Sequence, residues 1–111
     1  EICEASKVSA EIKYDDLPLL PGVNELASDG IIPGGTKRNL SFATSFTHFH
    51  NQLTKIQKLI SADAQTSGGL LISLPPDSAK IFIKKFNERS PIKAQEIGNI
   101  IKQKTNTIYV T

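Results

Sequence analysis

The chain has 111 residues, a length that suits one domain with a modest core. Its 39% hydrophobic and 22% charged residues are typical of soluble globular proteins, and a net charge of +2 is too small to indicate binding to nucleic acid or to an anionic membrane. There is no signal-peptide pattern and no apolar run near the roughly 18 residues of a membrane span. The single cysteine, Cys3, fits a reducing compartment. We therefore expect a cytoplasmic protein with neither nucleic-acid nor membrane partners.

The sequence contains no methionine, and its first residues, EICEASK, are typical of the end of a helix that lacks an N-cap. We expect residues 1–111 to be a single, partial domain of a larger protein.

The first half of the chain predicts a strand followed by helices. Residues 7–14 alternate between apolar and polar side chains, which predicts a half-buried strand. Pro21 and Gly22 begin a short helix that runs to Ala27 or Ser28, and Gly30 ends it. We expect a loop over 30–39, an ambiguous stretch over 40–47 and a helix over 48–61, where apolar residues recur at helical spacing.

The second half predicts strand, helix, strand and strand. The apolar run 70–75 is typical of a buried strand, and a helix capped by Asp77 or Ser78 extends to about residue 89. Strands over 93–102 and 106–111 are expected to form a hairpin that turns at Asn106. The expected fold class is α+β, with a mixed β-sheet packed against helices.

Two glycine-bearing stretches carry the candidate chemistry: PGGTKRN at 33–39 and QTSGG at 65–69. Glycine lets backbone N–H groups approach an anion closely, and a hydroxyl or a cation can complete such a site. A plain glycine turn with solvated charges is the alternative for each stretch. The two stretches flank the 48–61 segment and could meet in space. The candidate binding residues are Gly34, Gly35, Thr36, Arg38, Asn39, Gln65, Thr66, Ser67, Gly68 and Gly69.

The first stretch is not a P-loop. Gly30 and Gly35 have the required spacing, but Thr36 and Lys37 stand in the reverse order. We expect neither a strand leading into this stretch nor a clear helix after it. His48 and His50 make a poor metal pair on a helix, because positions i and i+2 do not share a face. We predict no metal site in this chain.

The two stretches together resemble a known family. PGGTKRN followed by DAQTSGGLLIS is similar to the C-terminal domain of the selenide, water dikinases, or selenophosphate synthetases, of the aminoimidazole ribonucleotide synthetase superfamily. KVSAEIKYDDLPLLPG and AQEIGNII resemble flanking family motifs in the same order. Ala64 stands where the family usually has proline, and Lys7 where it often has glycine.

The resemblance implies an enzyme that makes selenophosphate, AMP and orthophosphate from selenide, ATP and water, with magnesium. It also implies a homodimer, whose subunits pair an N-terminal ATP-binding domain with this C-terminal domain. The family's reactive cysteine or selenocysteine, its partner lysine and its magnesium-binding aspartates lie upstream. We therefore expect no catalytic residue in this chain, no tightly bound cofactor and no activity from it alone.

Two alternatives remain open at this point. The chain could come from another superfamily member, such as a purine-pathway synthetase or a thiamin phosphate kinase. It could also be a binding domain without chemistry.

Overall fold

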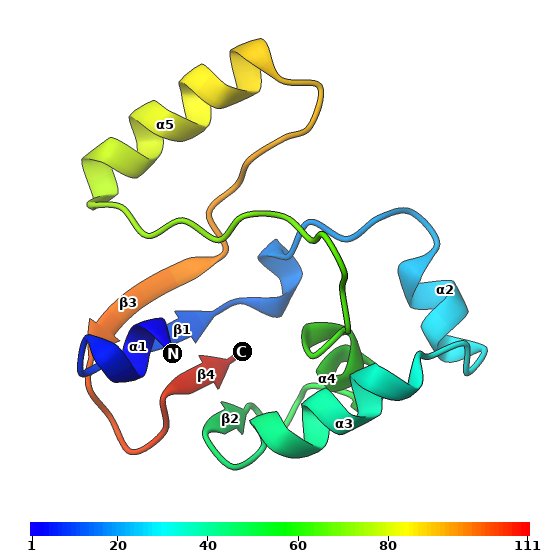
Figure 1. Ribbon diagram of the computed structural model, residues 1–111. Helices are drawn as coiled ribbons and strands as arrows, with labels where there is room; N and C mark the ends of the chain where they lie inside the picture. The colour runs from blue at the N-terminus through cyan, green and yellow to red at the C-terminus, as the bar shows by residue number, and fades with distance from the viewer.

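The computed structural model describes all residues, Glu1–Thr111, and places four strands in one sheet with the helices around it (Figure 1). The elements in chain order are α1 (Ile2–Ala5), β1 (Val8–Ile12), the 3₁₀ helix η1 (Tyr14–Asp16), α2 (Val23–Ser28), α3 (Gly34–Ala43), β2 (Thr47–Phe49), α4 (Lys55–Ser61), α5 (Pro76–Arg89), β3 (Gly98–Lys102) and β4 (Ile108–Val110).

The sheet is mixed, with the order β2-β4-β1-β3. β1 pairs antiparallel with β3 and parallel with β4, and Ala10 lies opposite both Ile100 and Ile108. β2 pairs in parallel with β4. The expected α+β class is confirmed. The expected hairpin is wrong: β3 and β4 do not pair with each other, because β1 lies between them.

Several local predictions for the first half are confirmed. β1 forms within 7–14, and α2 ends where expected. Gly22 and Gly30, which flank α2, have φ angles of 85° and 84°, in the left-handed region that glycine adopts without strain. Lys7, at the turn before β1, also has a positive φ, of 52°, which explains why glycine suits this position better.

Two predictions between residues 30 and 61 are wrong. Residues 34–39, expected in a loop, form the first part of helix α3, which continues to Ala43 through the stretch left ambiguous. The expected 48–61 helix begins only at Lys55, because Thr54 and Gln57 form a reciprocal capping box: Thr54 Oγ1 accepts from Gln57 N–H, and Gln57 Oε1 accepts from Thr54 N–H. His48 and Phe49, upstream of this cap, belong to β2.

The expected strand over 70–75 is also wrong. This segment pairs with no strand, and Leu70, Leu71 and Ile72 are 91%, 67% and 49% exposed. Helix α5 does form, beginning at Pro76, but none of its residues is buried. In Figure 1, α5 stands apart from the sheet.

The core is small and is divided between the sheet with α1 packed on β1 and the helices α2 and α3 packed on α4. Only eight residues are buried, two of them polar. Because β1 alternates, Ala10 and Ser9 face opposite sides of the sheet, yet both are buried. The buried residues are Cys3, Ser9, Ala10, Tyr14, Ala27, Thr36, Leu59 and Val110.

Candidate functional site

The first glycine stretch meets residues 62–64, the segment directly before QTSGG, at the start of α3. Thr36, which is 2% exposed, donates a hydrogen bond from Oγ1 to Asp63 Oδ1 at 2.8 Å. The same oxygen accepts from Ala64 N–H at 3.2 Å. Further along α3, Asn39 Nδ2 donates to the carbonyl oxygen of Ala62 at 3.3 Å. The first turns of α3 are therefore fastened to the segment 62–64 that follows α4.

Gly35 allows this close approach. A methyl group at Gly35 would lie 2.9 Å from the Cβ of Ala64, closer than real side chains pack. At this position glycine serves the contact between α3 and residue 64. A methyl group at Gly34 would meet only Arg38 Nη1, at 3.7 Å.

The guanidinium of Arg38 lies beside the N-terminus of α3. Its Nη1 would lie 3.7 Å from a Cβ at Gly34, and its Nη2 would lie 3.9 Å from a Cβ at Gly35. The first N–H groups of a helix have no acceptor within the helix, and the helix dipole places partial positive charge there. The cation and the helix terminus thus make one positive corner, whose charge the neighbouring Asp63 carboxylate partly offsets.

The QTSGG residues lie next to this corner but contact α3 through no hydrogen bond. Gln65 Nε2 donates to Asp63 Oδ2 at 3.5 Å, and Gly68 lies against the Gln65 side chain. Ser67 has φ 98°, a strained value for a residue other than glycine. Thr66 and Gly69 are exposed. Sequence reasoning left Asp63 out of the candidate residues, although it opens the DAQTSGG motif.

We expect Thr36→Val to destabilise the protein by about 1–3 kcal/mol, because it would strand Asp63 Oδ1 and Ala64 N–H without their partner. Thr36→Ser keeps the hydroxyl and should restore most of the loss. Urea denaturation monitored by circular dichroism would measure both. A Thr36→Val variant as stable as the wild type would show that the hydroxyl contributes nothing.

The P-loop remains rejected. A helix does begin inside the motif, at Gly34, which corrects the expectation of no helix there. However, residues 31–33 before it are irregular and belong to no strand. The strand–loop–helix arrangement of a P-loop is therefore missing.

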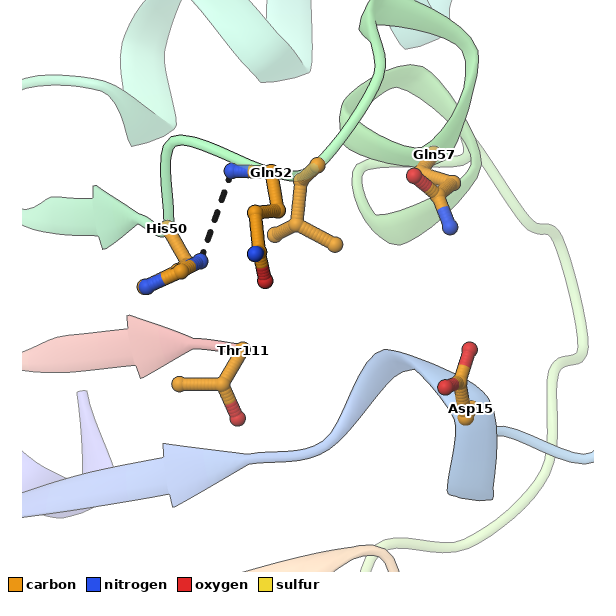
Figure 2. A pocket seen from close by; sticks show the side chains of 6 residues that line it. Asp15, His50, Gln52, Gln57 and Thr111 are labelled. Carbon is orange, nitrogen blue, oxygen red and sulfur yellow. Dashed lines mark hydrogen bonds between the residues drawn. The ribbon is translucent and has the colours of Figure 1, made fainter.

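A polar cavity of about 160 Å³ lies between η1, the turn after β2 and the start of α4 (Figure 2). His50 Nδ1 accepts from the backbone N–H of Gln52 at 3.4 Å. His48 instead contacts the ring of Tyr109 and does not line the cavity, so the two histidines do not belong to one site. No three His, Cys, Asp or Glu side chains cluster in a way that could hold a metal ion. The lining residues are Asp15, His50, Gln52, Leu53, Gln57 and Thr111.

Tyr14, next to this cavity, is buried and donates from its hydroxyl to Asn24 Oδ1 at 3.2 Å. Burial, and then the nearby Asp15 carboxylate, raise the pKa of Tyr14 above its usual value. The phenol therefore stays protonated and serves as a hydrogen-bond donor that joins η1 to α2.

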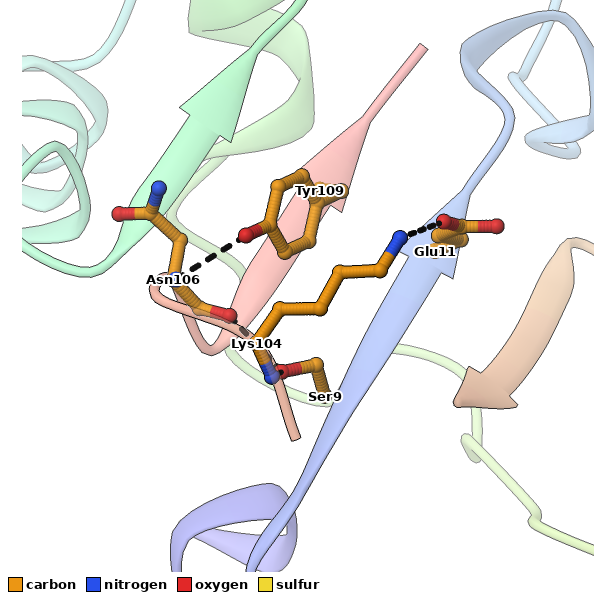
Figure 3. A network of polar contacts seen from close by, with 5 residues as sticks. All are labelled: Ser9, Glu11, Lys104, Asn106 and Tyr109. Carbon is orange, nitrogen blue, oxygen red and sulfur yellow. Dashed lines mark hydrogen bonds and ion pairs between the residues drawn. The ribbon is translucent and has the colours of Figure 1, made fainter. Parts of the chain in front are cut away.

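A second group of polar residues joins the connection between β3 and β4 to β1 (Figure 3). Ser9 Oγ donates to the carbonyl oxygen of Asn106 at 2.8 Å and accepts from Lys104 N–H at 2.9 Å. These bonds hold the connection 103–107 across the start of β1, so that β4 emerges on the other side of β1 from β3. Lys104 Nζ pairs with Glu11 Oε1 at 2.8 Å, and this hydrogen bond raises the pKa of Lys104.

We expect Ser9→Ala to lower the free energy of unfolding by about 1–3 kcal/mol. The hydroxyl is fully buried, and its removal would leave the carbonyl of Asn106 and the N–H of Lys104 without their partner. Ser28→Ala is the matched control. The Ser28 hydroxyl is exposed and bonds only to Asn24 of the same helix, so its loss should change the free energy of unfolding by less than about 0.5 kcal/mol. Thermal unfolding would compare them. Similar losses for both would contradict the role given to Ser9.

Comparison with known proteins gives the family. The family described as AIR synthase related protein, C-terminal domain, matches residues 1–111. The chain belongs to this family. Its relatives include proteins named selenide, water dikinase from Aliarcobacter butzleri, Pasteurella multocida and Haemophilus ducreyi, which are 35%, 38% and 40% identical to it. The alignments cover 97%, 100% and 91% of this chain but only 31%, 31% and 26% of those proteins.

The family assignment confirms the resemblance seen in the two glycine stretches and the expected fold. The chain spans about a third of the length of the curated relatives it matches. None of its helices has the length and apolar character needed to cross a membrane.

Proposed function

We propose that residues 1–111 are part of the C-terminal domain of a selenide, water dikinase, which makes selenophosphate from selenide, ATP and water. The relatives carry that name and match nearly the whole chain. The observation that favours a role at the nucleotide is the positive corner: the N-terminus of α3 with the Arg38 guanidinium beside it.

This corner suits a phosphate group. Helix N-termini bind anions through free N–H groups, and a guanidinium offers paired donors to phosphate oxygens. Gly34 is exposed and leaves the backbone at the start of α3 accessible, and the hydrogen bonds from Thr36 and Asn39 to residues 62–64 hold the helix in place. When bound, ATP would supply the transferable phosphoryl group. The part played by this chain would be to position the phosphates and offset their charge.

The QTSGG loop would add polar groups beside the positive corner. Gln65, Thr66 and Ser67 offer side-chain donors and acceptors next to Asp63, and the strained φ of Ser67 is of the kind that often occurs at binding sites. Magnesium needs several oxygen ligands, and this chain offers no acidic cluster for it. The magnesium ligands and the reactive cysteine or selenocysteine with its lysine would come from the rest of the enzyme, which we propose to be a cytoplasmic homodimer.

Phosphorus NMR of the full-length enzyme with ATP, magnesium and selenide tests the proposal. We expect a selenophosphate signal that depends on selenide, together with AMP and orthophosphate, and no such product from residues 1–111 alone. A folded full-length enzyme that consumes ATP without selenide would instead indicate another member of the superfamily, such as a purine-pathway synthetase or a thiamin phosphate kinase.

A further inference from the structure

Asp63 is the only side chain in residues 1–111 that forms hydrogen bonds to both glycine stretches. Its Oδ1 accepts from Thr36 Oγ1 of the first stretch at 2.8 Å, and its Oδ2 accepts from Gln65 Nε2 of the second stretch at 3.5 Å. The bond from Thr36 is short and comes from a buried residue, so it holds the carboxylate beside the start of α3. The second carboxylate oxygen is therefore presented to Gln65 from a fixed position.

The side chain of Gln65 folds back over its own loop. A Cβ at Gly68 would lie 2.4 Å from Gln65 Oε1, so the amide lies against the backbone of residue 68, and glycine leaves the space for it. Ser67, between these two residues, has a φ of 98°, a strained value that persists only where the surroundings hold it. The bond between Gln65 and Asp63 is the only hydrogen bond that residues 65–69 form within the chain. This one contact therefore fixes the loop.

We propose that Asp63 is a positioning residue for the phosphate site, an inference that rests on the proposed function. It holds Gln65, and with it the QTSGG loop, beside the positive corner that Arg38 and the start of α3 form. A carboxylate suits this role because it has two acceptor oxygens, one for each stretch. Since like charges repel, the carboxylate would not contact a phosphate itself, and it acts through Thr36 and Gln65.

A double-mutant cycle at positions 63 and 65 of the full-length enzyme tests the proposal. Gln65→Glu places a second carboxylate against Asp63. The repulsion should release the loop and lower selenide-dependent turnover by about tenfold or more. Adding Asp63→Asn exchanges donor and acceptor: the new amide can donate to the new carboxylate, while its oxygen still accepts from Thr36. This double variant should recover turnover to within about threefold of the wild type.

Gln65→Glu combined with Asp29→Asn is the matched control, because it has the same net charge as the first double variant. Asp29 is exposed at the end of α2 and forms no ion pair, so its replacement should not restore turnover. Thermal unfolding above the assay temperature would show that every variant is folded. The proposal is overturned if Gln65→Glu leaves turnover unchanged, if Asp63→Asn fails to restore it, or if both double variants recover equally.

Limited proteolysis with thermolysin, without any substrate, provides a second measurement. This protease cuts before leucine, and Leu70 and Leu71, directly after the loop, are 91% and 67% exposed. Gln65→Glu should speed cleavage there by about threefold or more, because the loop loses its only hydrogen bond. Adding Asp63→Asn should remove the increase. Cleavage of the Gln65→Glu variant at the wild-type rate would overturn the proposal.

The proteolysis needs neither ATP nor selenide, so it separates this proposal from the proposed function. If the enzyme makes no selenophosphate but cleavage follows the expected pattern, the link between Asp63 and Gln65 stands and the proposed function fails. If selenophosphate forms but Gln65→Glu lowers turnover equally with and without Asp63→Asn, the function stands and the positioning role of Asp63 fails.

Discussion

Replacing Gly98 with alanine is expected to lower the free energy of unfolding by about 3 kcal/mol or more. Gly98 begins β3 and lies opposite Ile12 of β1. A Cβ at this position would overlap the carbonyl oxygen of Glu11 and lie 2.9 Å from the Cα of Ile12. All of these atoms belong to the backbone of β1, so no side-chain rotation can relieve the overlap. The two strands would have to separate at this end.

Gly69→Ala is the matched control, because a Cβ there meets no atom within 4 Å and the backbone has no positive φ. We expect it to change stability by less than about 0.5 kcal/mol. Urea denaturation of both variants, followed by circular dichroism, would measure the difference. If Gly98→Ala were as stable as Gly69→Ala, the close pairing of β1 with β3 at Gly98 would be wrong.

The elements that could be predicted are those whose signals are local. The alternation of residues 7–14 predicts β1, and the glycines at 22 and 30 predict the two ends of α2. The apolar spacing before Ser90 predicts α5 even though that helix buries nothing. These signals lie within a few residues of the element they specify, so they can be interpreted without knowing the rest of the fold.

The errors concern long-range pairing. The hairpin was a reasonable expectation for two strands separated by a short connection, yet β1 lies between them. The buried hydroxyl of Ser9 holds the connection between β3 and β4 against β1 from 95 and 97 residues away in the chain, and no local pattern near Asn106 reveals this contact. The strand predicted over 70–75 failed because an apolar run becomes a strand only where another strand offers hydrogen bonds.

The candidate site was predictable in composition but not in geometry. Glycines with a hydroxyl and a cation indicated an anion site, and the structure does bring Thr36 and Asn39 to the segment that precedes QTSGG. The sequence alone could not show that Thr36 is buried as a tie to Asp63, because the two are 27 residues apart. It also placed Arg38 in a loop, whereas the residue lies on α3. Whether the predicted binding residues contact a nucleotide remains a prediction.

Arg38→Ala in the full-length enzyme is expected to lower selenide-dependent turnover by about 10- to 100-fold, the loss typical of removing one preorganised charge at a phosphoryl-transfer site. Stability should hardly change. Arg38 is exposed on α3 and makes no ion pair, and alanine favours a helix at least as well as arginine. Steady-state kinetics with phosphorus NMR detection, together with thermal unfolding, would separate the two effects.

Lys37→Ala is the matched control for Arg38. The two residues are neighbours on α3, both are exposed, and each substitution removes one positive charge. Only Arg38 has its guanidinium beside Gly34 and Gly35, so only its loss should slow the reaction strongly. If both variants lost turnover equally, the effect would come from net charge near the start of α3 and not from the position of the guanidinium. If neither lost turnover, Arg38 would have no part in handling phosphate, and the start of α3 would serve only to pack against residues 62–64.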